Sequence, residues 1–136
     1  MSKNIILLIE DDELDVISVT RSLKNLGIDY ELHTAYNGIE ALNLIANGLM
    51  PDVILLDLNM PKMNGLEFLQ IIRTNDDLKH IEVFVMTTSA DNTDREETTA
   101  LGISGYIIKP LNYTDNNKRS DSMASFVQFH LRKILK

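Results

Sequence analysis

The stretch VILLD, residues 53–57, consists of four apolar residues followed by an aspartate. A continuous apolar run of this length is typical of a strand that is buried on both faces, as strands are in parallel sheets. A second such run, Ile5–Ile9, is followed by the acidic residues Glu10, Asp11 and Asp12. We therefore predict two central parallel strands, each of which ends in acid.

Shorter strand-like runs alternate with segments of helical periodicity along the rest of the chain. Three further strands are predicted at Tyr30–Ala35, which has the weak alternation of an edge strand, and at Ile81–Met86 and Ser104–Ile108. One helix is predicted after each strand, at 12–27, 37–48, 66–72, 93–102 and 123–134. Five β–α units without hairpin-length links predict a doubly wound parallel sheet with helices on both faces.

Two of these helices carry additional signals. The fourth helix begins with Thr93-x-x-Glu96, a pattern typical of a capping box, and it has few large apolar residues, so we expect it to pack most loosely. The first helix is preceded by Asp12, a good N-cap residue. We therefore assign Asp12 to helix capping rather than to chemistry.

Composition limits the function classes. With 136 residues, no repeats and no linker-like tract, residues 1–136 are predicted to form a single domain without a second module. The net charge of −7 argues against binding to DNA. The absence of cysteine excludes disulfides and zinc–thiolate sites, and no segment reads as a signal peptide or membrane span. We expect a cytoplasmic protein that does not associate with membranes.

Chemically active side chains gather at the predicted strand ends. In an open parallel sheet, ligands bind at the carboxyl ends of the strands, which is where Glu10, Asp11, Asp57, Thr87 and Lys109 stand. Converging carboxylates repel one another unless a cation arrives, and Mg²⁺ prefers oxygen ligands of this kind. The carboxylate that ends the central strand, Asp57, is the natural nucleophile for an aspartyl phosphate. The lysine and the threonine hydroxyl are suited to contact phosphoryl oxygens.

Four motifs at these strand ends resemble the receiver domain of bacterial two-component response regulators. They are LLIEDD (7–12), VILLDLNMPKMNG (53–65), FVMTTS (84–89) and GYIIKP (105–110). Each motif alone is weak, but four in order at the right strand ends are highly specific. The resemblance implies the flavodoxin-like receiver fold, with strand order 2-1-3-4-5 and five helices.

The resemblance also implies a metal-assisted phosphoryl acceptor site. Asp57 would accept a phosphoryl group from a phosphohistidine of a sensor histidine kinase. Asp11 would bind Mg²⁺ directly, Glu10 would act through water, Asp57 would be a ligand, and the backbone carbonyl of Asn59 would complete the protein's share of the metal shell. Lys109 would contact the phosphoryl group.

The same resemblance implies a switch between two states. Thr87 and Tyr106 would form the switch pair, with Thr87 moving toward the phosphoryl group and Tyr106 turning inward. Because we expect no output domain in a stand-alone receiver, the product would be an interaction. Its form would be a downstream protein partner, a phosphorelay step to a phosphotransfer protein, or a homodimer.

Two departures from the family pattern stand out. The residue after the switch threonine is usually small, but here it is Thr88, whose bulk would narrow access to Asp57. The polar segment 112–122 is longer than usual. Such lengthening resembles the single-domain receivers that serve phytochrome-type kinases.

Two other functions fit the topology less well. An aspartate-nucleophile phosphatase needs a second acid two residues after the nucleophile, and Asn59 occupies that position, so we predict a phosphoacceptor with self-dephosphorylation at most, not a turnover enzyme. A nucleotide- or flavin-binding module needs a glycine-rich loop after the first strand, where this chain has acid.

Overall fold

The structure is a computed structural model, and it describes residues 4–24, 27, 29–60, 62–87 and 92–108. The strands are β1 (Asn4–Ile9), β2 (Tyr30–Ala35), β3 (Val53–Asp57), β4 (Glu82–Thr87) and β5 (Gly105–Ile108). The described helices are α1 (Glu13–Leu23), α2 (Gly38–Ala46), α3 (Gly65–Thr74) and α4 (Asn92–Leu101). The helix predicted at 123–134 lies outside the described residues.

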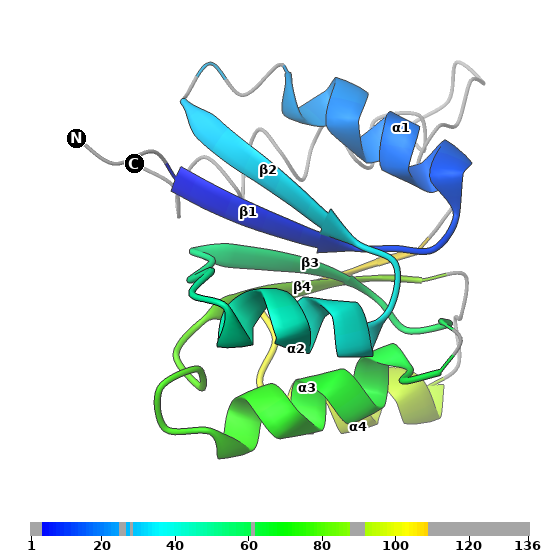
Figure 1. The fold of residues 1–136 in the computed structure, drawn as a ribbon. Coiled ribbons are helices and arrows are strands. Elements are labelled where there is room, and N and C mark those ends of the chain that lie inside the picture. Colours follow the sequence, from blue (N-terminus) through cyan, green and yellow to red (C-terminus); the bar gives the residue numbers. More distant parts are fainter. Residues whose placement is uncertain (1–3, 25–26, 28, 61, 88–91, 109–136) are drawn as a thin grey trace.

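The five strands form one parallel sheet in the order β2-β1-β3-β4-β5, as predicted. The helix α1 covers one face of this sheet, and α2, α3 and α4 lie on the other (Figure 1). The most buried strand is β3, all of whose residues are buried, and β2 is an edge strand, which confirms the interpretation of its weak alternation.

Two apolar clusters, one on each face of the sheet, form the core. On one face Val19 and Leu23 of α1 pack against the sheet, and on the other Phe68, Leu69 and Ile72 of α3 do so. All five side chains are fully buried. Because both faces of the central strands are covered, their sequences are continuous apolar runs.

Asx residues start three helices at the carboxyl edge of the sheet. Asp12 accepts a hydrogen bond from Leu14 N at 2.9 Å, which confirms its role as N-cap of α1. Asn37 caps α2, and Asn64 caps α3 in a capping box with Glu67. These caps satisfy amides that a helix start leaves without partners, and they fix where each strand-to-helix loop ends.

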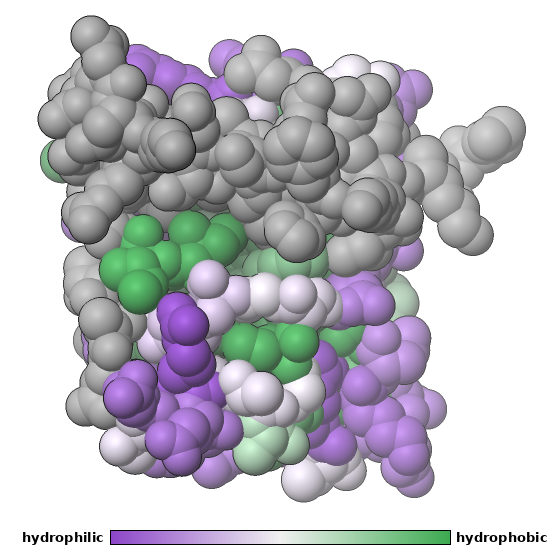
Figure 2. All heavy atoms as spheres, turned by 180° about the vertical axis from the view of Figure 1, so that it is seen from behind, coloured by the Kyte–Doolittle hydropathy of each residue, from purple (hydrophilic) through white to green (hydrophobic). Residues whose placement is uncertain are grey.

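The helix α4 differs from the others and corrects one prediction. It begins at Asn92, so Thr93 lies in its first turn instead of at the N-cap, and the predicted capping box is wrong. Only Thr98 of this helix is buried, which confirms the expected loose packing. Figure 2 shows the molecule from behind, where hydrophilic side chains cover the surface over α4. No helix in the described part of the chain has the length and apolar character needed to cross a membrane.

Candidate functional site

Three carboxylates meet at the carboxyl ends of β1 and β3. In the register of these strands Ile9 pairs with Leu56, so the residues that follow, Glu10 and Asp57, lie side by side. One carboxylate oxygen from each of Glu10, Asp11 and Asp57 lies within 4.8 Å of the other two. Parallel pairing of two strands that both end in acid is therefore what brings this cluster together.

The three acids differ in exposure. Glu10 is fully buried and Asp57 is 2% exposed, whereas Asp11 is exposed. A buried carboxylate needs hydrogen bonds or a cation to compensate for its lost hydration. Part of this comes from the backbone, because Asp12 N donates to Glu10 Oε2 at 3.2 Å and Asn59 N donates to Asp57 Oδ1 at 3.1 Å.

The donor set of the cluster fits a hard divalent cation. Three carboxylates supply only oxygen atoms, and ions such as Mg²⁺ prefer oxygen ligands. The exposed Asp11 places one edge of the cluster in contact with solvent, so an ion can arrive with part of its water shell. Among the described histidines, His33 does not belong to this cluster. It lies on β2, where its Nε2 is 3.2 Å from Oε2 of Glu31.

A buried hydroxyl ends the neighbouring strand β4. Asp57 pairs with Met86, so Thr87 lies one residue beyond Asp57 along the same edge of the sheet. Thr87 is fully buried, and its Oγ1 accepts a hydrogen bond from Asn59 Nδ2 at 3.1 Å. The structure thus brings Glu10, Asp11, Asp57 and Thr87 to one edge, as the sequence predicts.

Tyr106 lies on β5, next to β4. It pairs with Val85, two residues before Thr87, and alternate residues of a strand point to the same face. Tyr106 is partly buried, and the guanidinium carbon of Arg95 on α4 lies 4.6 Å from the centre of its ring. This cation–π contact connects α4 to the edge strand beside Thr87.

Three predicted features lie outside the described residues. Lys109 follows β5 directly, and Thr88 follows Thr87, but neither is among the residues that the structure describes. The segment 112–122 is likewise outside them. Their roles stay predictions.

Two features of the site were not predicted. The side chain of Asn59 donates a hydrogen bond to Thr87, whereas the family resemblance implies a role only for its backbone carbonyl, as a metal ligand. Gly65 approaches the main chain of the site so closely that a Cβ atom there would lie 2.3 Å from the carbonyl oxygen of Asp57. The Asn64-Gly65 dipeptide carries a signal for this tight passage, since it is typical of turns.

Comparison with known proteins agrees with this geometry. A family described as the response regulator receiver domain matches residues 6–119. The response regulator Rcp1 of Synechocystis sp. is 38% identical over 128 residues, which cover 90% of this chain and 87% of that protein. The chemotaxis protein CheY-3 of Vibrio cholerae is 31% identical, covering 90% of this chain and 94% of its own.

Solved structures of response regulators are also similar to this chain. The Mn²⁺-bound form of Rcp1 has a TM-score of 0.82 at 33% identity, covering 93% of both chains. The phosphorylated cyanobacterial phytochrome response regulator RcpA also has a TM-score of 0.82, at 31% identity, covering 96% of this chain and 95% of its own. With the family match spanning most of the sequence and the strand order it requires, this chain belongs to the response regulator receiver domains of two-component signalling.

Proposed function

We propose that the chain is a phosphoacceptor switch in which Asp57 receives a phosphoryl group from a sensor histidine kinase. The observation that carries this proposal is the cluster of Glu10, Asp11 and Asp57, each of which offers one carboxylate oxygen within 4.8 Å of the other two. The phosphorylated structure of the similar protein RcpA supports the proposal.

The transfer is a displacement at phosphorus. A carboxylate oxygen of Asp57 forms a bond to phosphorus, the bond between phosphorus and the imidazole nitrogen of the donor breaks, and the imidazole leaves. The product is an acyl phosphate on Asp57. The hydrogen bond from Asn59 N orients the carboxylate before transfer.

A divalent cation completes the site. Mg²⁺ is the ion proposed, held by Asp11 and Asp57, by Glu10 through water, and by the backbone carbonyl of Asn59. When bound, it neutralises the charge that gathers on the phosphoryl oxygens. The Mn²⁺-bound form of Rcp1 supports a divalent cation in a relative.

The remaining residues of the site are proposed to respond to the phosphoryl group once it is on Asp57. The Thr87 hydroxyl is proposed to donate to a phosphoryl oxygen, and Lys109 to contact it as a charge. Tyr106 is proposed as the second member of the switch pair. It pairs with Val85, which lies two residues before Thr87 on the adjacent strand β4. Few buried contacts hold α4, and low local stability suits an element that must move.

The product of the switch is proposed to be a changed binding face. A downstream protein, a phosphotransfer protein or a second copy of the chain is proposed to bind this face. The chain is proposed to act in the cytoplasm and not to contact DNA directly. Turnover of a substrate is not proposed, because the residue two positions after Asp57 is Asn59, whose amide cannot protonate a leaving group.

Intact mass after incubation with acetyl phosphate tests the proposal. Wild type with Mg²⁺ is expected to gain one phosphoryl group, whereas Asp57→Ala and chelated wild type gain none. Asp77→Ala, which changes an exposed aspartate in the loop between α3 and β4, is the matched control and is expected to be modified as wild type is. Modification that persists in Asp57→Ala contradicts the proposal.

A further inference from the structure

Asn59 holds two groups of the site at once. Its backbone N–H donates to Asp57 Oδ1 and its side-chain Nδ2 donates to Thr87 Oγ1, each at 3.1 Å. The first partner ends β3 and the second ends β4. One residue of the loop therefore connects the proposed phosphoacceptor to the proposed phosphoryl-binding hydroxyl.

The direction of the second bond matters for the Thr87 hydroxyl. Because Oγ1 accepts a hydrogen bond from the Asn59 amide, the hydroxyl's own hydrogen points away from that amide. A hydroxyl that accepts one hydrogen bond is polarised into a stronger donor for the next. Thr87 is fully buried and β-branched, so few rotamers are open to its side chain, and the hydrogen bond from Asn59 favours one of them.

We propose that the Asn59 side chain is a positioning residue that sets the Thr87 hydroxyl for donation to a phosphoryl group on Asp57. This inference rests on the proposed function and adds a role that the metal-binding backbone carbonyl of Asn59 does not have. The amide acts through Thr87 and does not itself contact the phosphoryl oxygens.

The geometry allows this role to be separated from folding. Asn59 is exposed, so water can solvate its amide when the bond to Thr87 is absent. Asn59→Ala removes only that amide and keeps the backbone N–H and the backbone carbonyl. A loss of phosphoryl binding in this variant is therefore not a consequence of lost core packing.

The test is a set of dissociation constants for beryllofluoride, a tetrahedral analogue of the phosphoryl group, measured by calorimetry with saturating Mg²⁺. Asn59→Ala is expected to bind about fivefold more weakly than wild type, which is the usual net worth of one hydrogen bond. Asn43→Ala, which removes an exposed asparagine on α2, is the matched control and is expected to bind as wild type does.

A double-mutant cycle then asks whether Asn59 acts through Thr87. In the Thr87→Ala background, the additional change Asn59→Ala is expected to have no effect, because the hydroxyl is already absent. In the Thr87→Ser background, where the hydroxyl is kept, the loss of about fivefold is expected to persist.

Each contrary outcome has a distinct meaning. If the affinity of Asn59→Ala is unchanged or higher, the amide does not position the hydroxyl and the inference is overturned. A loss that survives in the Thr87→Ala background overturns it too, because the amide then contacts the ligand directly. If wild type neither binds beryllofluoride nor gains a phosphoryl group, the proposed function fails and the inference fails with it.

Discussion

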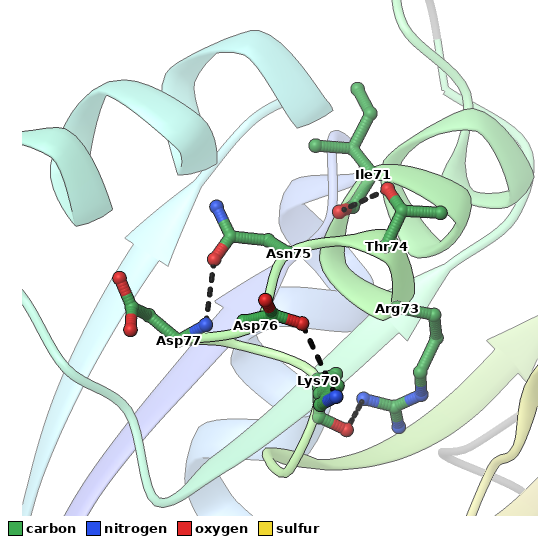
Figure 3. A network of polar contacts seen from close by, with 7 residues as sticks. All are labelled: Ile71, Arg73, Thr74, Asn75, Asp76, Asp77 and Lys79. Carbon is green, nitrogen blue, oxygen red and sulfur yellow. Dashed lines mark hydrogen bonds and ion pairs between the residues drawn. The ribbon is translucent and has the colours of Figure 1, made fainter.

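The guanidinium of Arg73, on α3, donates two hydrogen bonds to the carbonyl oxygen of Gly102, the residue that follows α4. They run from Nε at 3.0 Å and from Nη2 at 2.8 Å. A third bond from Nη1 to the Lys79 carbonyl, at 3.0 Å, connects the same side chain to the loop before β4 (Figure 3). One arginine therefore fixes the C-terminal end of α4, a helix that buries only Thr98.

Replacing Arg73 by lysine is expected to loosen α4. An ammonium cannot reproduce a planar fork of donors, so at least one of the three bonds is lost. Burial lowers the pKa of Arg73 below its usual value, and the nearby carboxylate of Glu82 opposes this shift in part. Part of the free energy needed to desolvate the guanidinium is therefore already offset in the wild type. We expect the free energy of unfolding to fall by about 1 kcal/mol in urea denaturation, with faster hydrogen exchange along α4. Arg21→Lys, an exposed position on α1, serves as the control and should change neither quantity.

Gly65 is expected to tolerate no side chain. A Cβ atom there would lie 2.3 Å from the carbonyl oxygen of Asp57 and 2.7 Å from the Cα atom of Leu58, and backbone atoms cannot move aside. Gly65→Ala should lower the free energy of unfolding by about 3 kcal/mol. Thermal unfolding measures this.

Gly38 provides a matched control for Gly65. It also is the first residue of a helix after an asparagine cap, but its Cβ atom would meet only the flexible side chain of Met63, at 2.9 Å. Gly38→Ala should therefore cost less than about 1 kcal/mol, because the methionine can change rotamer. Equal costs at the two positions would contradict this explanation.

Lys62 has the only positive φ of a described residue other than glycine, at 64°. This left-handed conformation costs an ordinary residue about 1 kcal/mol, and glycine adopts it without strain. Lys62→Gly is expected to raise the melting temperature slightly, since the relieved strain outweighs the extra entropy of the unfolded chain. Lys24→Gly, at a φ of −60°, should lower it instead. A lower melting temperature for Lys62→Gly would show that the strain is not stored there.

The sequence predicted the strands best where burial alone decides the pattern. The apolar runs of β1 and β3 are covered on both faces, so their positions can be read from hydrophobicity. At β4 the prediction Ile81–Met86 is displaced by one residue, because Ile81 N bonds to the Leu78 carbonyl in a turn while Thr87 joins the ladder opposite Ile108. Such boundaries depend on partners distant in the chain.

The candidate site shows the same contrast between features that the sequence pattern specifies and contacts that depend on distant residues. That Glu10, Asp11 and Asp57 would meet follows from parallel pairing, which puts all strand ends at one edge. The bond from Asn59 to Thr87 joins residues 28 positions apart through one side-chain rotamer. No periodicity or motif specifies a rotamer, so this contact could be found only in the structure.

Asp11 belongs to the carboxylate cluster, whereas the next residue, Asp12, does not. Without divalent cations, Asp11→Asn is expected to raise the melting temperature, because it removes repulsion among three carboxylates. With Mg²⁺ at ten times its dissociation constant, wild type should gain about 1.4 kcal/mol of stability, and Asp11→Asn clearly less.

Asp12→Asn is the control for this experiment, because it removes the same charge from the next residue and keeps a good N-cap for α1. Its melting temperature should rise with Mg²⁺ as that of wild type does. Circular dichroism during a Mg²⁺ titration measures all three proteins under the same conditions. A full Mg²⁺ response in Asp11→Asn, or a lost response in Asp12→Asn, would mean that the ion is held by other residues than the cluster, since charge alone cannot distinguish the two variants.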